Sequence, residues 1–355
     1  MARPRPGYAA RVMLTSSSFF AAPPPARTLA VAMVLLFASA GSAAESACLN
    51  AAARIPPPPR ALAMAAAAQR EHEAFGAPTM DAEGRLLESG RSEGEDSRPT
   101  LATPAPWQRV LGYWEAVAQP RTPLPSLVRF GALRPADRTL LLQALNQASA
   151  SHLRGLGVGP DQGLDAAELR AMATAVNRVA AIDTPWSAAF VSWLAQQAGL
   201  GADEFAFSEA HADYAGAAWQ AGAAEAAGRE TRYAMRACDL ARTPPRVGDL
   251  ACHTRGAASE LDSFERIGGV LTTRATGGEP LPMHCDVVVK VDERGFDTIG
   301  GNVLQSVTRR RLDFAPGTRT LDPSYYLPAG CTIGAAGCTD RHMSWQPWSL
   351  LLQWR

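Results

Sequence analysis

The chain has 355 residues, of which 47% are hydrophobic and 19% charged, as is ordinary for a globular protein. Its 34 basic and 34 acidic residues cancel, which argues against a nucleic-acid partner and against attachment to a membrane by charge alone. The length accommodates one folded domain of about 250 residues together with flanking segments.

The N-terminus predicts an export signal. Several arginines precede an apolar run from Leu29 to Phe37, and small residues follow up to Ala44. A positive start, an apolar run and a small-residue cleavage site are typical of a signal peptide, here residues 1–44. The run is too short to span a bilayer well. We therefore expect a periplasmic or secreted protein that begins near Glu45 and has no membrane span in its mature chain.

Export changes the interpretation of the six cysteines, because an oxidising compartment favours disulfides. Cys331 and Cys338 bracket a short loop rich in glycine and alanine, and we predict that they are paired. Cys285 is expected to face away from the neighbouring His284 on a strand, where it is a suitable partner for Cys252. The sequence leaves the connectivity of Cys48, Cys238, Cys252 and Cys285 open.

Residues 45–106 are predicted to be weakly structured. They contain a proline run at 56–59, a short alanine-rich helix from Arg60 to Phe75 and a polar linker that ends at Pro106. From Trp107 onward, apolar residues recur at helical spacing, which indicates a folded domain over 107–355. Helices are predicted there at 107–117, 137–148, 165–182, 185–198 and 209–227.

The helix at 185–198 has clear start and stop signals. Asp183 and Thr184 are candidate N-caps, Pro185 suits the first turn, and Gly199 can end the helix. Ser187 then lies in the first turn, where free N–H groups and the helix dipole favour negative charge. This is a suitable place for a nucleophile, although Ser187 could also serve only as a cap.

Predicted strands follow the helices. The segment from Val247 to Cys252 is short, and the segment from His284 to Val291 is β-branched and is followed by a turn. Helices followed by an antiparallel sheet predict an α+β fold. The later strands are predicted at 296–299 and 303–312, interrupted by Gly300-Gly301-Asn302, and at 348–354.

Four segments of the chain carry a family resemblance: Pro185-Trp186-Ser187-Ala188-Ala189-Phe190-Val191, Gly248-Asp249-Leu250, Met283-His284-Cys285 and Gly300-Gly301-Asn302. In the same order, they resemble motifs of bacterial cell-wall hydrolases of the NlpC and CHAP groups, which have a papain-like fold. Over most of 107–355 the chain is also similar to an uncharacterised bacterial family, domain of unknown function 2272. The resemblance implies a papain-like α+β domain that hydrolyses an amide or peptide bond of peptidoglycan.

The resemblance also implies a set of catalytic residues. A nucleophilic serine needs a base, and the base needs a group that orients it. In the papain-type arrangement Ser187 is the nucleophile, His284 the base and Asn302 the orienting residue. Asp286 competes with Asn302, because strand alternation places it on the same face as His284.

Three residues are expected to line the substrate groove: Trp186, His211 and Asp286. For His211 the alternative is a structural role at the start of a helix. A metal site that includes His211 and His253 is conceivable, but the sequence lacks the close ligand spacing of known metal motifs. We therefore predict neither a metal nor another cofactor.

One departure from the resembled hydrolases concerns the nucleophile, because Ser187 stands where they have cysteine. An alcohol ionises far less readily than a thiol, so the helix dipole alone cannot activate Ser187. A true general base is then required. The chain is expected to be either a serine hydrolase or a non-catalytic module that binds cell-wall peptide or glycan in the same groove.

Overall fold

The computed structural model describes residue 45 and residues 47–96, 104–117, 167, 178, 181–274, 278–325 and 343–355. All of them belong to one unit, Ala40–Arg355. The predicted signal peptide, the predicted helix at 137–148, most of the predicted helix at 165–182 and the predicted Cys331–Cys338 pair lie outside the described residues.

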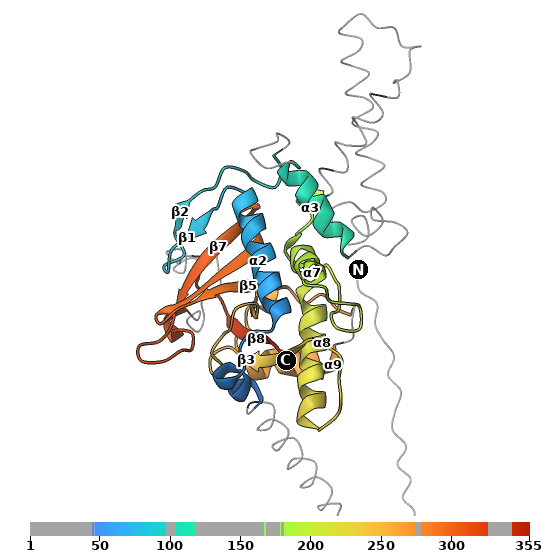
Figure 1. The fold of residues 1–355 in the computed structure, drawn as a ribbon, viewed down its shortest axis with the longest axis vertical. Coiled ribbons are helices and arrows are strands. Elements are labelled where there is room, and N and C mark those ends of the chain that lie inside the picture. The colour runs from blue at the N-terminus through green and yellow to red at the C-terminus, as the bar shows by residue number, and fades with distance from the viewer. Residues whose placement is uncertain are drawn as a thin grey trace, which may run out of the picture. The chain divides into compact units, whose positions relative to one another are not determined.

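A mixed sheet of eight strands forms the framework of this unit (Figure 1). Its strand order is β2-β1-β7-β6-β5-β4-β8-β3. Neighbouring strands are antiparallel except for β1 and β7, which run parallel. The strands are β1 (Thr79–Met80), β2 (Leu86–Glu88), β3 (Met235–Asp239), β4 (Leu250–Thr254), β5 (Met283–Val291), β6 (Gly295–Val303), β7 (Ser306–Asp313) and β8 (Trp348–Trp354).

Helices pack against this sheet, and three of them (α2, α7 and α8) contact the central strand β5. Within the described residues, no helix is both long and apolar enough to cross a membrane. The helices are α2 (Pro59–Ala74), α3 (Pro106–Glu115), α7 (Ser187–Gln197), α8 (His211–Ala226) and α9 (Phe264–Thr273), with short 3-10 turns at Gly256–Ala258 and Pro323–Tyr325.

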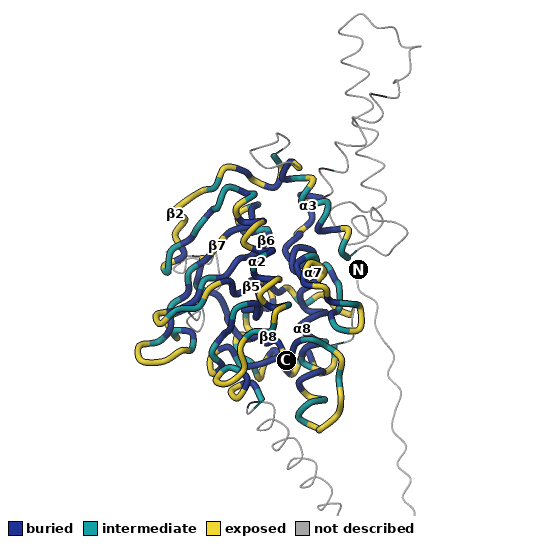
Figure 2. Tube along the Cα trace, viewed as in Figure 1, coloured by how far each residue is buried: buried dark blue, intermediate teal, exposed yellow. Residues whose placement is uncertain are grey.

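Strand alternation divides the buried residues into two clusters. Cys285 and Val287 of β5 join the larger cluster, together with Phe190 of α7 and other helix residues. Ala251 and Val288 point the other way and join a smaller cluster on the opposite face. Figure 2 shows the buried residues gathered between the helices and the sheet. The sheet is therefore covered on both faces.

Several predicted elements are confirmed. The alanine-rich helix predicted from residue 60 is α2, the last predicted strand is β8, and the fold is α+β. Helix α2 does not lie in a linker, since Ala61 and Met64 are fully buried in the larger cluster. A Cβ added to Gly248 would lie 2.5 Å from the carbonyl oxygen of Ala61. This close contact shows that the folded unit begins well before the predicted boundary at residue 107.

Other predictions need correction. Helix α7 begins at Ser187, and Trp186 is its N-cap residue without a side-chain hydrogen bond, so neither Asp183 nor Thr184 caps it. Strand β6 runs unbroken through Gly300 and beyond, although its register with β7 is irregular there. The predicted interruption by Gly-Gly-Asn was wrong, because glycine is required at these strand positions by close packing. Strand β3 and helix α9 were not predicted.

Two disulfides connect distant parts of the chain. Cys252 and Cys285 are directly opposite each other on β4 and β5 and form a disulfide, one of the pairings that the sequence left open. Cys48 lies in a helical stretch at 47–54 and is bonded to Cys238 of β3. Such bonds are consistent with an extracellular location.

Candidate active site

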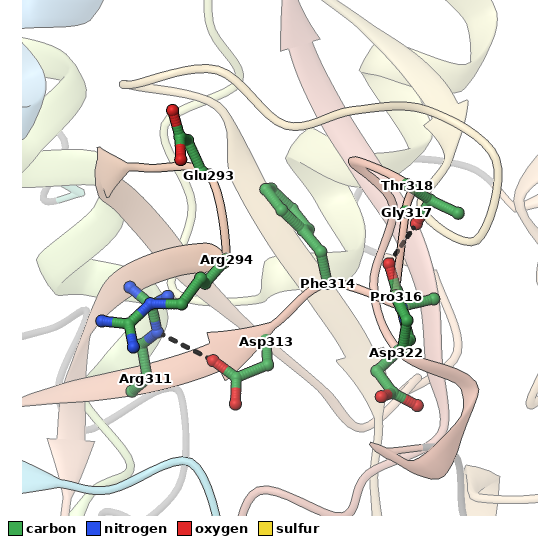
Figure 3. Close-up of a pocket in the computed structure, with 10 residues that line it drawn as sticks. Glu293, Arg294, Arg311, Asp313, Phe314, Pro316, Gly317, Thr318 and Asp322 are labelled. Carbon is green, nitrogen blue, oxygen red and sulfur yellow. Dashed lines mark hydrogen bonds and ion pairs between the residues drawn. The ribbon is translucent and has the colours of Figure 1, made fainter.

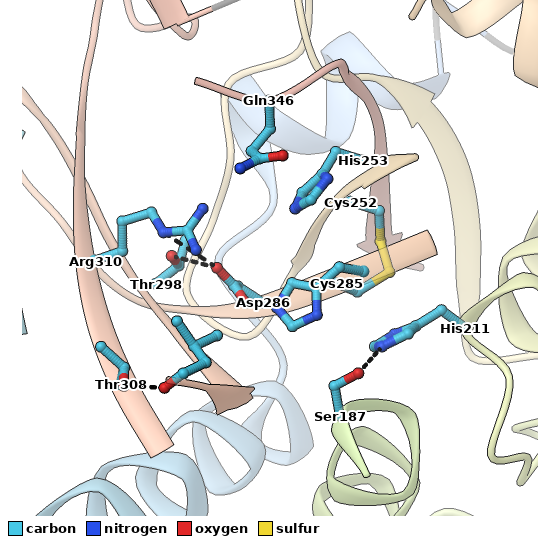
Figure 4. Close-up of polar contacts among 12 residues, drawn as sticks. Ser187, His211, Cys252, His253, Cys285, Asp286, Thr298, Thr308, Arg310 and Gln346 are labelled. Carbon is cyan, nitrogen blue, oxygen red and sulfur yellow. Dashed lines mark hydrogen bonds and ion pairs between the residues drawn. A yellow bond between two sulfur atoms is a disulfide. The ribbon is translucent and has the colours of Figure 1, made fainter. Parts of the chain in front are cut away.

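The starts of helices α7 and α8 bring Ser187 and His211 together. Ser187 is the first residue of α7, and His211 is the first residue of α8. The Ser187 Oγ lies 2.7 Å from Nε2 of His211 (Figure 4). Ser187 therefore does occupy a first turn, but the histidine in contact with its hydroxyl is His211, which the sequence placed only along the groove.

Tyr214 engages the other nitrogen of the same imidazole. It lies one turn further along α8, on the side of His211, and its hydroxyl is hydrogen-bonded to Nδ1. Burial raises the pKa of Tyr214 well above its usual value, so the phenol keeps its proton. Burial also lowers the pKa of His211 well below its usual value, and the charges of His284 and Arg255 add to this effect. His211 is therefore a neutral imidazole that donates from one nitrogen and accepts at the other.

A second buried pair consists of His284 and Asp286 on β5. Nε2 of His284 lies 2.7 Å from Oδ1 of Asp286. The other carboxylate oxygen accepts a hydrogen bond from Thr298 and lies 3.9 Å from Nε of Arg310 (Figure 4). Burial alone would raise the pKa of Asp286, but His284 and Arg310 outweigh burial and lower it. The carboxylate is therefore ionised, and His284 donates its Nε2–H to it and keeps Nδ1 for another partner.

The two pairs adjoin through a row of aromatic rings. The ring centroid of His284 lies 5.2 Å from that of His211 and 5.5 Å from that of His253. His253 in turn packs against Trp348 at 4.8 Å and shares a hydrogen bond between Nδ1 and the carbonyl oxygen of Thr254. One buried cluster therefore contains a serine, three histidines and an ionised carboxylate.

Asn302 does not occupy the predicted orienting position. Among the described residues, it makes no side-chain hydrogen bond to His211 or His284, and its backbone is left-handed with φ 56°. Asp286, the competing candidate, fills that role for His284. A Cβ added to Gly300 would lie 2.0 Å from Oδ1 of Asp286 and 3.0 Å from Nε2 of His284. Glycine at position 300 thus makes room for this pair.

Trp186 belongs to the core and not to an open groove. Its side chain is fully buried and packs against Phe75 and Tyr113, with ring centroids 6.2 and 5.8 Å away. The indole N–H has no hydrogen-bond partner in the described part of the chain. Trp186 therefore fixes the start of α7 by packing, directly before Ser187.

The side chains of this buried cluster have little contact with solvent. Ser187, His211 and His284 are 2%, 4% and 5% exposed. A surface hollow of about 520 Å³ lies elsewhere, between the turn that contains Arg294 and the segment 313–318 (Figure 3). No member of the buried cluster lines this hollow. In the described conformation, the cluster is closed to large substrates.

A protein-family model matches residues 157–353, which is more than half of the chain. Its description is "Uncharacterized protein conserved in bacteria (DUF2272)". The chain belongs to the DUF2272 family. No curated protein and no solved structure matches it. The matched segment of this DUF2272 member contains both buried pairs, whereas α2 and α3 precede it.

Sequence reasoning missed Tyr214 as a partner of His211. The signal was present, because a histidine and a tyrosine three residues apart on a helix share one side of it. Arg310 was also missed as a partner of Asp286, since only the pairing of β6 with β7 places it there. The structure forms no metal-binding group of three or more His, Cys, Asp or Glu side chains within the described residues.

Proposed function

We propose that this DUF2272 protein is a serine hydrolase that cleaves an amide or ester bond. The observation that carries the proposal is the hydrogen bond of 2.7 Å between Ser187 Oγ and His211 Nε2 at the start of α7. A nucleophile in contact with a base, and a base oriented by a third group, is the arrangement that activates an alcohol. Tyr214 is the third group here.

The proposed reaction begins with the neutral His211. Its Nδ1–H donates to the Tyr214 hydroxyl, which leaves Nε2 free to accept the proton of Ser187. Ser187 Oγ then bonds to the substrate carbonyl carbon, and the proton passes from His211 to the leaving group. Water hydrolyses the resulting ester in a second step. The free N–H groups in the first turn of α7 supply hydrogen bonds to the developing oxyanion.

His284 remains a candidate for the same work. The ionised Asp286 stabilises a positive charge on His284. His211 has no such carboxylate partner among the described residues, since its ring nitrogens are bonded to Ser187 and Tyr214. The ring of His284 adjoins that of His211. Because Ser187 contacts His211 directly, His211 takes the proton of Ser187 in the proposed reaction. His284 and Asp286 are then the second acid–base pair of the site.

The substrate class that we propose is the peptide part of cell-wall peptidoglycan. It rests on the resemblance to NlpC and CHAP hydrolases, which implies a papain-like frame with Ser187 in place of cysteine. Export to the periplasm or beyond, expected from residues 1–44, would bring the protein to that substrate. The two disulfides support this location.

The second candidate function is a module that binds cell-wall peptide or glycan without cleaving it. The burial of Ser187 favours this alternative, because a serine that is 2% exposed has to become accessible before it can attack. In that case the network of Ser187, His211 and Tyr214 is a satisfied structural hydrogen-bond network.

The test is muropeptide release from purified sacculi by wild type, Ser187→Ala, His211→Asn and His284→Asn. A hydrolase that uses Ser187 should lose on the order of 10⁶ in rate on Ser187→Ala. Ser192→Ala is the matched control, since Ser192 is also a buried, hydrogen-bonded serine of α7. The larger of the losses on His211→Asn and His284→Asn identifies the base.

Binding to sacculi is measured in parallel. If wild type and Ser187→Ala bind equally and release nothing, the binding module is correct. Ser187→Cys then becomes informative, because a thiolate needs less help from a base and can restore cleavage. Release by Ser187→Ala at the wild-type rate would place the chemistry elsewhere and refute the proposal.

A further inference from the structure

Arg255 differs from the other arginines of the described chain. Its guanidinium makes no hydrogen bond or ion pair within the described residues, and its side chain is nevertheless partly buried. The other described arginines either have a hydrogen-bonded or ion-paired side chain or are exposed to solvent. Withdrawing a cation from water without a partner is costly. A partner from outside the chain would recover that cost.

The position of Arg255 places it next to the candidate site. It follows the end of β4, and its backbone N–H donates to the carbonyl oxygen of Pro282, which precedes β5. Strand alternation gives Arg255 the same side of β4 as His253. The ring of His253 adjoins that of His284, which adjoins that of His211.

The electrostatics of the site agree with this placement. The charge of Arg255 contributes to the lowered pKa of His211 and opposes the raised pKa of Tyr214. Both effects agree with the position of Arg255 after β4, on the side of His253. Two other described arginines near the site are ion-paired: Arg310 lies beside Asp286 and over the ring of Trp348, and Arg274 pairs with Asp213 of α8. Among the described residues, Arg255 is therefore the arginine near the site that has charge to offer a ligand.

We infer that Arg255 binds a free carboxylate of the substrate, so that the bond attacked by Ser187 lies close to a carboxylate-bearing residue of a peptide. A guanidinium presents paired N–H donors that match the two oxygens of a carboxylate. Arg255 is thus a specificity-determining residue, and this role rests on the proposed function of Ser187. Peptides with a free C-terminal or side-chain carboxylate near the scissile bond are the expected substrates.

The experiment uses muropeptides released from sacculi and the same mixture after its carboxylates have been converted to carboxamides. Binding of both to Ser187→Ala is measured by calorimetry, with and without Arg255→Gln. Amidation should weaken binding roughly 10- to 100-fold, the range for hydrogen bonds to a charged group. Arg255→Gln should cause a similar loss and should then bind both mixtures alike. Arg255→Lys, which keeps the charge, should retain part of the preference.

Arg294→Gln is the matched control, because Arg294 is exposed and its side chain has no partner in the described residues. It should bind like the parent, and thermal unfolding checks that Arg255→Gln is folded. An undiminished carboxylate preference in folded Arg255→Gln, or equal binding of both mixtures by the parent, would overturn the inference. Carboxylate-dependent binding without cleavage by wild type would refute the hydrolase while the role of Arg255 stands.

Discussion

In the proposed mechanism, the Tyr214 hydroxyl accepts a hydrogen bond from Nδ1–H of His211. With the phenol as acceptor, Nδ1 is protonated and Nε2 can serve as the base. Tyr214→Phe removes the acceptor, so the imidazole can turn its proton toward Ser187 and lose its basic nitrogen there. We predict that muropeptide release falls by about 10²-fold, a loss typical of impaired general-base catalysis. Binding to sacculi should be retained.

Tyr233→Phe is the control for this prediction. Tyr233 is a partly buried tyrosine whose hydroxyl is hydrogen-bonded to backbone groups of Ala206 and Tyr214 and not to a histidine. It should lose stability without a comparable loss in rate. Equal rates for wild type and Tyr214→Phe would show that His211 does not depend on the phenol for its tautomer.

Buried neutral histidines make stability depend on pH. Burial lowers the pKa of His211 and of His253 well below 6.5, so in acid the unfolded chain binds protons that the folded chain does not. The contribution of these histidines to the free energy of unfolding is therefore fully present above pH 6.5 and is lost as the pH falls. Each histidine contributes a slope of up to about 1.4 kcal/mol per pH unit. Asp249 has the opposite effect, because burial raises its pKa to about 6. Below pH 6 the folded chain binds up to one proton at Asp249 that the unfolded chain does not, which offsets part of the decline.

The measurement is the urea-derived free energy of unfolding between pH 7.5 and about 5.5. We predict a decline towards acid that is shallower in His253→Asn, whose amide can replace the hydrogen bond from Nδ1 to the carbonyl oxygen of Thr254. A flat profile, or an identical slope in the variant, would contradict the inferred neutrality of His253.

At the scale of elements, β6 is shaped by what lies on its two faces. Gly300 faces the pair of His284 and Asp286, and Gly301 faces Phe190 of α7, whose Cβ would lie 2.7 Å from an added Cβ. The two glycines therefore let one strand approach a buried ion pair on one side and a helix on the other.

Gly300→Ala should displace the Asp286 carboxylate, because an added Cβ would lie 2.0 Å from Oδ1. We predict a loss of at least about 3 kcal/mol in the free energy of unfolding, from overpacking together with a disrupted buried ion pair. Urea denaturation measures it. Gly269→Ala is the control, since an added Cβ there meets no atom within 4 Å and the residue lies in helix α9. Similar unfolding free energies for the two variants would refute the packing argument.

Local patterns in the sequence predicted those elements whose formation depends on nearby residues. The β-branched run of β5 and the apolar run of β8 were recognisable in this way, as was the start of α7 to within two residues. Strand alternation also indicated that Cys285 faces away from His284 and is a suitable partner for Cys252, to which it is bonded. Strand β3 was missed because it is defined by its pairing with β8, more than 100 residues later in the chain.

The candidate site was only partly predictable for the same reason. Ser187, His284 and Asp286 lie within segments that local patterns identify. The contact between Ser187 and His211 depends on how α8 packs relative to α7, which local patterns do not contain. Sequence reasoning therefore identified Ser187 and both histidines of the cluster but assigned the wrong neighbour to Ser187.

At the scale of the whole molecule, helix α2 is part of the same packed structure as the family-matched segment. Its residues contact β5, β6, β7 and α7. Arg60 of α2 also forms a bidentate ion pair with Glu204, which lowers the pKa of that carboxyl to about 2. Residues that precede the family match therefore contribute to the stability of the segment that carries the site.

The Cys48–Cys238 bond joins residues 190 positions apart and closes a covalent ring that separates the two buried pairs of the candidate site. Ser187 and His211 lie inside this ring, whereas His284 and Asp286 lie beyond it. A protease that cuts once anywhere between residues 48 and 238 therefore opens the ring without releasing a fragment. The nicked protein keeps its full mass until a reductant separates the two pieces, so both halves of the site stay tethered through a cut that would divide an unbridged chain.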